Sequence, residues 1–517
     1  MSEHSAAPGP APRYGPRPAP ETGDEVLVIG GGFTGLAAAH ELALAGVACR
    51  VLERDPYVGG LAGSFEVGGA RLERFYHHWF SSDLEVRGLC AELGCSELLE
   101  PHRTRTGVYY ANSVYRLSSP WDVLRFAPLP LPDRVRLGWS AVRAHRVRHW
   151  RDLEDLTARE WLLELSGPRV YETVWRPLLE GKFGEYAEEV GATWMWTKLH
   201  LRGGSRSHSG REVLYYLRGG CAALLDAWVS HLSGLGVRIC TDTPVRQVLT
   251  DAHGVCGVRT ASGVLPARRV LATTAPDLLA GFLAPAAGGP PPHPDLPAVR
   301  RRLSGIPYLA NLCLVLENDR SLSDTYWLNV TDPSFPYVGV IEHTNLEDSG
   351  AYAGRHLVYL SAYLPTSAEL YRMDDEAVFE ASLPHLSRMF PRFHRDWVRR
   401  HHVWRADHAQ PVVTPRYSDR IPAMETDVPG LYLASMAQVY PQDRGTNYAV
   451  RQGRHAGRLI ADRMRTARRG TRESHRDTNR DSHRDAHRTV RRTAPGPWSP
   501  GAGHGAAPRS GPEEGTP

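Results

Sequence analysis

Residues 24–35 read Asp-Glu-Val-Leu-Val-Ile-Gly-Gly-Gly-Phe-Thr-Gly. The apolar residues 26–29 predict a buried parallel strand, and the pattern G-x-G-x-x-G that follows predicts the start of a helix. Gly30 permits the tight turn, Gly32 lets a pyrophosphate approach the backbone, and Gly35 lets the helix pack closely on the strand. Unpaired N–H groups at a helix N-terminus bind phosphate. The segment therefore predicts an α/β fold with a Rossmann-type dinucleotide-binding domain.

The second strand, 48–52, ends in a carboxylate at the expected place. Glu53 lies 18 residues after Gly35, close to the separation at which a carboxylate binds a ribose diol. The sequence then continues Arg-Asp-Pro-Tyr-Val-Gly-Gly-Leu-Ala from residue 54 to residue 62. This run resembles the extended motif of the flavin amine oxidase and protoporphyrinogen oxidase superfamily, which also includes phytoene desaturases and UDP-galactopyranose mutase.

The resemblance covers most of residues 24–464 and implies that the cofactor is FAD. It extends through 217–220 and 243–245, through the returning strand 267–276, and through 430–436 and the helix after 440–449. It departs at Leu61, where many members have arginine, and at Ser435-Met436, where the family usually has Gly-Asp. The implied FAD contacts are Gly30, Gly32, Phe33, Thr34, Gly35, Glu53, Arg54, Gly59, Gly60, Leu61, Val245, Ser435, Met436, Gly445, Thr446 and Asn447. Thr446 and Asn447, like Asp443, are alternatively ordinary helix-capping residues.

The chain alternates between α/β segments and segments rich in Trp, Tyr, Arg and Pro. We expect an FAD-binding domain built from 24–99, 216–299 and 416–464. A discontinuous α+β substrate domain, 100–215 and 300–415, is then inserted twice. We expect disorder in an N-terminal tail, 1–23, because it is rich in proline, and in an Arg-rich C-terminal tail, 465–517.

Two segments are expected to line the substrate side. The aromatic run 75–80 contains His77 and His78, which are candidate catalytic residues or, alternatively, structural histidines. Lys182 is the third catalytic candidate, because only two of the 61 cationic side chains are lysines and arginine would not replace a titrating amine. An unselected surface lysine is the alternative. The candidate substrate-binding residues combine flat apolar faces with cations: Arg176, Trp196, Arg206 and Tyr440.

Composition and charge exclude several classes. The 517 residues contain no apolar run of about 18 residues, which a membrane-spanning helix requires. The net charge of +4 comes from residues 465–517, which carry eleven arginines against six acidic residues, so the rest of the chain sums to −1. A nucleic-acid partner is therefore not expected. The seven cysteines form no C-x-x-C pair, and no metal site is expected. The N-terminus lacks signal-peptide features, so we expect a cytoplasmic protein.

These features predict an FAD-dependent oxidoreductase that dehydrogenates a biosynthetic intermediate, by desaturation or amine oxidation, with hydride transfer to the flavin. The substrate is expected to be a small molecule, anionic or sugar- or lipid-linked. One alternative is a flavoenzyme of the UDP-galactopyranose mutase type, which acts on a sugar nucleotide without net redox change. The other is a non-catalytic flavin-binding or redox-sensing protein. The oligomeric state does not follow from the sequence.

Overall fold

The computed structural model describes residues 25–116, 120–204, 213–284 and 291–468. The two predicted tails and Arg206 therefore lie outside the described residues, apart from 465–468. By its internal contacts the chain divides into residues 1–461 and 462–517. The described part of the second unit, 462–468, is helical. The first unit contains the sheets and the cavity described below.

The predicted Rossmann-type sheet is present and is parallel throughout. Its order is β10 (Arg238–Cys240), β2 (Cys49–Leu52), β1 (Val26–Ile29), β14 (Arg269–Ala272) and β20 (Leu431–Leu433). All four residues of β1 are buried, because a central parallel strand is covered on both faces. The strands come from the three segments in which the sequence predicts the FAD-binding domain.

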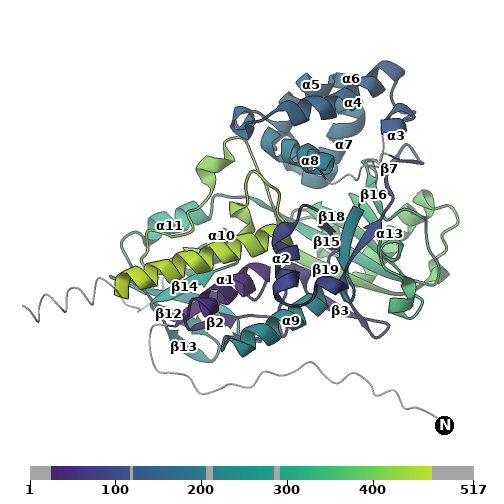
Figure 1. The fold of residues 1–517 in the computed structure, drawn as a ribbon. Helices are drawn as coiled ribbons and strands as arrows, with labels where there is room; N and C mark the ends of the chain where they lie inside the picture. The colour runs from purple at the N-terminus through teal and green to yellow at the C-terminus, as the bar shows by residue number, and fades with distance from the viewer. Residues whose placement is uncertain (1–24, 117–119, 205–212, 285–290, 469–517) are drawn as a thin grey trace, which may run out of the picture. The chain divides into compact units, whose positions relative to one another are not determined.

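Different layers cover the two faces of this sheet. On one face, α1 (Phe33–Leu44) packs beside α9 (Gly220–Gly234) and beside a helix that begins at residue 446 (Figure 1). On the other, a core of aliphatic side chains joins the parallel sheet to a small antiparallel sheet and two helices. These elements are β11 (Val245–Asp251), β12 (Gly254–Thr260), β13 (Gly263–Pro266), α10 (Pro276–Phe282) and α11 (Leu296–Leu303). The parallel sheet with helices packed against it agrees with the predicted α/β class.

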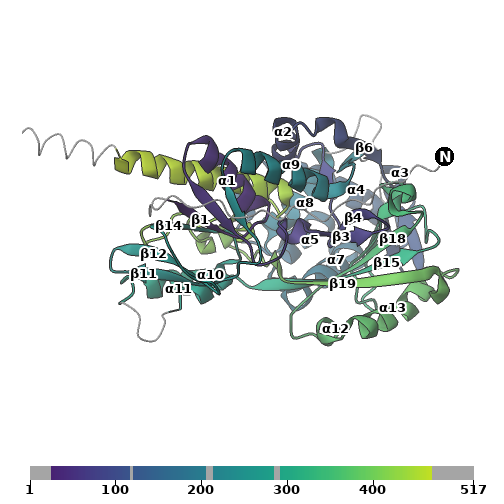
Figure 2. The same ribbon diagram turned by 90° about the horizontal axis from the view of Figure 1, so that it is seen from below.

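A seven-stranded sheet lies beside this domain (Figure 2). Its order is β19 (Val398–Pro411), β15 (Tyr308–Asn318), β18 (His356–Leu364), β17 (Gly339–Glu342), β16 (Trp327–Val330), β7 (Thr106–Tyr110) and β8 (Ser113–Arg116). One face packs against α12 (Glu369–Arg372) and α13 (Asp375–Met389). Smaller elements complete this region: β3 (Ser64–Val67), β4 (Ala70–Glu73), β5 (Trp79–Phe80), β6 (Leu99–Arg103), β9 (Val213–Leu217) and α2 (Leu84–Glu92).

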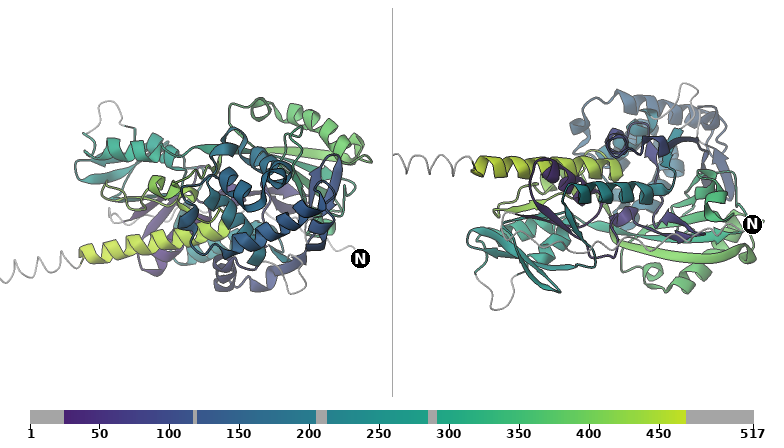
Figure 3. Two further views of the ribbon diagram at one scale, coloured as in Figure 1. Left: turned by 90° about the horizontal axis from the view of Figure 1, so that it is seen from above. Right: turned by 60° about the horizontal axis from the view of Figure 1, so that its bottom comes forward.

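A group of helices forms a separate hydrophobic core (Figures 1 and 3). It consists of α3 (Pro120–Leu124), α4 (Leu131–Arg146), α5 (Ala158–Ser166), α6 (Pro168–Val170), α7 (Arg176–Phe183) and α8 (Ala192–Gly204). The group and the seven-stranded sheet fall within the two predicted insertions, but the exact domain boundaries remain a prediction. Among the described residues, every helix is too short or too polar to cross a bilayer.

Gly35 offers a test of the packing between α1 and β1. A Cβ atom at this position would overlap the carbonyl oxygen of Gly30, which is backbone and cannot move without opening the turn. We expect Gly35→Ala to lower the melting temperature and to abolish FAD retention, because overpacking of a rigid contact destabilises the fold. Gly88→Ala in α2 is the matched control, since its Cβ would meet no atom within 4 Å. Equal melting temperatures and equal flavin content in the two variants would contradict this view of the turn.

Candidate active site

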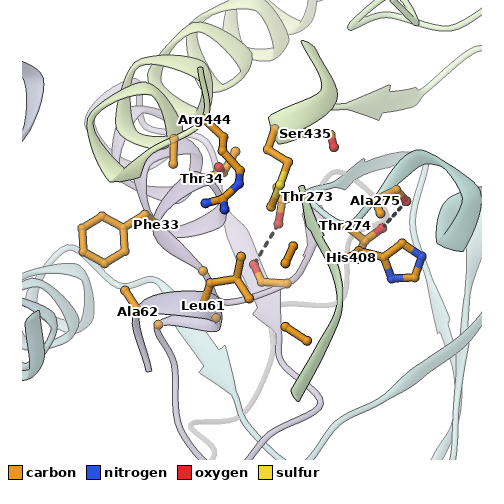
Figure 4. A pocket seen from close by; sticks show the side chains of 18 of the residues that line it. Phe33, Thr34, Leu61, Ala62, Thr273, Thr274, Ala275, His408, Ser435 and Arg444 are labelled. Carbon is orange, nitrogen blue, oxygen red and sulfur yellow. Dashed lines mark hydrogen bonds between the residues drawn. The ribbon is translucent and has the colours of Figure 1, made fainter. Parts of the chain in front are cut away.

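A single cavity of about 630 Å³ begins at the glycine turn and reaches the edge of the seven-stranded sheet (Figure 4). The turn, the ends of β2 and β14 and the loop after β20 form one end. The other end is lined by Tyr76, Asn311, Tyr363 and Arg444. This size falls within the range of sites for small molecules and cofactors.

Two glycine-rich segments meet at the first end. The N–H of Gly59 donates to the carbonyl of Gly31 at 2.9 Å, and Gly32 and Gly59 form an isolated parallel bridge. Gly60 has a φ of +57°, and a Cβ there would lie 3.3 Å from the Cα of Gly32. The close approach of two backbones therefore requires glycine at these positions. This contact also accounts for the glycine pair noticed in the sequence.

The first turn of α1 is open to the cavity. Its N-cap, Gly32, provides no side-chain cap, and Gly32, Phe33 and Thr34 all line the cavity wall. The first N–H groups of a helix have no intrahelical acceptor, and the helix dipole adds positive character at this end. The arrangement suits a diphosphate.

Glu53 is buried beside the turn and keeps its carboxylate in the cavity wall. One oxygen accepts from the N–H of Gly31 at 2.6 Å and the other from the N–H of Asp55 at 2.9 Å. These two bonds fix the side chain and leave lone pairs of both oxygens for a ligand, since each oxygen accepts more than one bond.

Two residues at the far end of the cavity, Tyr363 and Arg444, belong to a network of charged and polar groups that continues behind the cavity wall. Arg444 donates to the Tyr363 hydroxyl at 2.6 Å and to Gln410 at 3.1 Å. Gln410 donates in turn to Asp443 at 3.3 Å, and Asp443 forms an ion pair with Lys198. The nearby cations outweigh burial and hold the pKa of Asp443 well below its usual range, so it is ionised.

Lys182 lies next to this network. Its ammonium is 4.1 Å from the centre of the Tyr363 ring and is only partly exposed. Burial lowers the pKa of Lys182 to about 8. Burial raises the pKa of Tyr363, but the positive charges of Arg444 and Lys182 overcome that effect and bring it down to about 8. Lys182 and Tyr363 therefore each gain or lose a proton near neutral pH.

Asn311 adds a fixed amide to the same wall. Its side-chain N–H₂ donates to the Ser361 hydroxyl at 2.9 Å and to the carbonyl of Ala362 at 3.1 Å. Because a carbonyl can only accept, these bonds fix which end of the amide is oxygen. That oxygen is buried and finds no hydrogen-bond partner among the described residues. Although Asn311 lines the cavity, this oxygen has almost no accessible surface, so the structure does not present it to a ligand.

The two predicted histidines have different surroundings. His77 lines the cavity and donates through Nδ1 to the carbonyl of Phe75 at 2.6 Å, and burial lowers its pKa. Its neutral ring thus offers Nε2 as an acceptor. His78 is not among the cavity-lining residues. It bonds the hydroxyl of Tyr326 at 3.0 Å and packs edge-on against the ring of Trp327.

Comparison with known proteins identifies the family. The family model for flavin containing amine oxidoreductases matches residues 33–461. The chain belongs to this family. The resemblance seen in the glycine motifs is thereby confirmed, as are the expected FAD cofactor and the expected class of flavoprotein oxidoreductase.

Individual relatives are distant. Pseudooxynicotine dehydrogenase from a Pseudomonas species is 23% identical over 261 residues, which is 48% of this chain and 50% of that protein. The chain spans about half the length of the curated relatives it matches. A solved structure described as a protoporphyrinogen oxidase from Exiguobacterium superposes with a TM-score of 0.66 at 17% identity, covering 85% of this chain and 99% of that one. Reduced UDP-galactopyranose mutase superposes with a TM-score of 0.65 at 14% identity, covering 84% and 95%. These structural likenesses concern the fold.

The cavity fits the dinucleotide part of FAD. The open helix N-terminus supplies donors for a pyrophosphate, and the fixed carboxylate of Glu53 supplies an acceptor for a ribose diol. Fourteen of the sixteen FAD contacts expected from the sequence line the cavity. Gly35 and Asn447 do not. Gly35 packs against Gly30, and the Asn447 side chain accepts from the N–H groups of Glu85 and Val86 at 2.9 and 3.2 Å. Asn447 thus holds the start of α2, a helix other than the one in which it lies.

Three of the expected substrate-binding residues are also absent from the cavity-lining set. Arg176 is half-exposed and pairs with Glu172 and Glu180 on its own helix. Trp196 stacks on His200, and the Tyr440 hydroxyl bonds Glu154 and Thr193. Lys182 reaches the cavity only through Tyr363. Substrate binding by Arg176, Trp196 and Tyr440 remains a prediction that the cavity does not support.

Several cavity residues carried no signal in the sequence. Asn311 and Tyr363 face each other across β15 and β18, and Ala406 pairs with Asn311 from β19. Pairing across strands brings these residues to one face, although more than 40 residues separate each from the next along the chain. Tyr76 and Arg444 lie within motifs that the sequence highlighted, but nothing local distinguished them from their neighbours.

The fixed geometry of Glu53 predicts a large effect of its removal on the cofactor. We expect Glu53→Ala to weaken FAD binding by about 10- to 100-fold, because a charge-assisted hydrogen bond to a buried diol contributes about 1.5–3 kcal/mol. Titration of the apoprotein with FAD, followed by flavin fluorescence, measures this change. Glu53→Gln keeps one acceptor and should retain part of the affinity. Unchanged affinity in Glu53→Ala would show that the carboxylate does not bind the cofactor.

Proposed function

We propose that the chain is an FAD-dependent dehydrogenase that takes a hydride from a C–H bond of a small biosynthetic intermediate and so oxidises the adjoining C–N or C–C single bond to a double bond. The observation that carries this proposal is the single cavity, which joins a dinucleotide-binding turn to an end where Tyr76, Tyr363 and Arg444 converge. Membership in the family of flavin containing amine oxidoreductases supports amine oxidation as one form of the reaction, and the name pseudooxynicotine dehydrogenase of the Pseudomonas relative supports dehydrogenation.

The chain's own residues supply binding and proton transfer. The segments 30–34, 53–54 and 59–61 would hold the diphosphate and ribose of FAD, and 435–436 with 445–446 would hold the remainder. FAD, when bound, accepts the hydride and gains negative charge. Arg444 lines the far end, and Lys182 and Lys198, which do not line the cavity, lie with it around one carboxylate, Asp443, so this end favours negative charge. The same excess of positive charge would strengthen the binding of a substrate that carries an anionic substituent.

A substrate that gives up a hydride from carbon must also lose a proton from an adjacent N–H or C–H. Tyr363 lines the cavity and Lys182 lies against its ring, and each has a pKa near 8, so we propose these two groups as acceptors of this proton near neutral pH. The neutral Nε2 of His77 is another acceptor on the cavity wall. Together they orient the substrate and remove its proton.

A rearrangement without net redox change is the second candidate function. The excess of positive charge at the far end also suits a sugar diphosphate. A non-catalytic flavin sensor, the third possibility from the sequence, is favoured by no feature of the cavity.

One experiment separates the three. The purified flavoprotein is given candidate amines, porphyrinogens and UDP-sugars under anaerobic conditions, and flavin absorbance is followed. A dehydrogenase is reduced by its substrate and consumes an electron acceptor on turnover. A mutase must first be reduced with dithionite or NAD(P)H and then consumes no acceptor, and a sensor converts no substrate. Conversion that requires pre-reduced flavin and consumes no acceptor would overturn the dehydrogenase proposal.

A further inference from the structure

Helices α3 and α4 expose an unusual amount of apolar surface. Six large apolar side chains in this short stretch are between 38% and 69% exposed: Trp121, Leu124, Leu131, Val135, Trp139 and Val142. Isolated exposed apolar residues are common, but a cluster marks an interaction site. Both helices lie in the helical group that is set apart from the five-stranded sheet in Figure 1.

The apolar residues of α4 form one stripe. Leu131, Val135, Trp139 and Val142 are spaced by four, four and three residues, which places them on one side of a helix. The opposite side of α4 is buried against the protein through Asp133, Leu137, Ser140 and Ala144. The helix therefore buries one side in the fold and leaves an apolar stripe exposed on the other.

Arginines border the exposed stripe. Residues 120–148 contain six arginines against two aspartates, Asp122 and Asp133. Asp133 is buried and already paired with Arg136 at 2.8 Å and Arg169 at 3.5 Å. Arg146 lies over the Trp139 ring, 5.1 Å from its centre. Arg143 pairs with Glu164 at 3.8 Å, and the remaining arginines leave a local excess of positive charge beside the apolar stripe, although residues 1–464 as a whole sum to −1.

We propose that the exposed face of α3 and α4 binds the surface of a bilayer that contains anionic phospholipids. A helix with tryptophan and aliphatic side chains on one side and arginines beside them lies in the interface, with its apolar side among the acyl chains and its cations at the headgroups. A second copy of the chain fits less well, because a symmetric contact would bring the two rows of arginines together. The binding is peripheral and is independent of FAD.

The test is sedimentation of the full-length flavoprotein with vesicles of phosphatidylcholine, with and without phosphatidylglycerol. We expect binding to the anionic vesicles, at least tenfold weaker binding to the neutral ones, and release at high salt. The double variant Val135→Glu/Trp139→Glu should lose at least tenfold in binding. Leu84→Glu, at a residue of α2 that is 68% exposed, is the matched control and should bind like wild type.

Flavin content and melting temperature of each variant verify that it is folded. Residues 465–517 also carry excess arginine and are unchanged in the α4 double variant. Loss of vesicle binding in that variant therefore assigns the binding to α4 and not to residues 465–517. Wild-type protein that stays in solution, or an α4 double variant that binds as well as wild type, would overturn the proposal. So would equal binding to neutral vesicles. Light scattering tests the other possible occupant of this face, a second copy of the chain. If the wild-type protein is a dimer and the double variant is a monomer, the face is an interface between two copies and the proposal is wrong.

Discussion

Replacing Lys182 by methionine or by arginine should slow flavin reduction by substrate at least tenfold while leaving FAD content unchanged. The ammonium lies 4.1 Å from the Tyr363 ring, outside the turn that holds the dinucleotide, so neither change should disturb cofactor binding. A correctly positioned proton acceptor raises the rate of such a step by about 10²- to 10⁴-fold over the same step without it. Arginine keeps the charge but stays protonated, so it cannot replace an amine that accepts a proton. Stopped-flow reduction under anaerobic conditions measures the effect.

The pH dependence of the same rate has a defined direction. Burial lowers the pKa of Lys182 to about 8, and only the neutral amine accepts a proton, so the wild-type rate should rise as the pH increases through 8. Tyr363 titrates in the same range, so Tyr363→Phe separates the two groups. We expect the rise to persist in Tyr363→Phe and to disappear in Lys182→Met. Reduction of the Lys182→Arg protein at the wild-type rate would remove Lys182 from the mechanism.

Replacing Arg444 by methionine should slow flavin reduction by about 100-fold. Its guanidinium points into the cavity (Figure 4) and holds Tyr363 at 2.6 Å and Gln410 at 3.1 Å. Loss of one fixed donor that stabilises developing negative charge costs about 10²- to 10³-fold in rate. The variant should also lower the reduction potential of the flavin, because a positive charge near its reduced form is lost.

Two further measurements on Arg444 distinguish charge from structure. Without the guanidinium, the pKa of Tyr363 should return toward its ordinary value, which ultraviolet titration of the tyrosinate can follow. Arg444→Lys keeps the charge and should recover part of the rate and most of the potential. An Arg444→Met protein with unchanged potential and unchanged rate would show that the residue only supports the fold.

The sequence alone predicted which segments form the cofactor end of the cavity. The strand 26–29, the glycines 30, 32 and 35, and Glu53 are close together along the chain, and their spacing reflects a local turn that few other residues can form. The pair Gly59-Gly60 is recognisable for the same reason, since two backbones in contact exclude a side chain. The predicted parallel sheet is present, and fourteen of the sixteen expected FAD contacts line the cavity, where their contact with FAD remains a prediction.

The reactive end of the cavity depended on the tertiary structure. Asn311, Tyr363 and Arg444 come from β15, β18 and the loop before the last helix, and strand pairing across long sequence separations brings them together. Arg176 looked like a substrate residue in sequence, yet two glutamates one turn away on either side engage it. Local spacing encodes turns and helix starts because these involve neighbours in the chain. The partners of a buried charge, and the pKa values they produce at Lys182 and Tyr363, are decided only when distant segments pack.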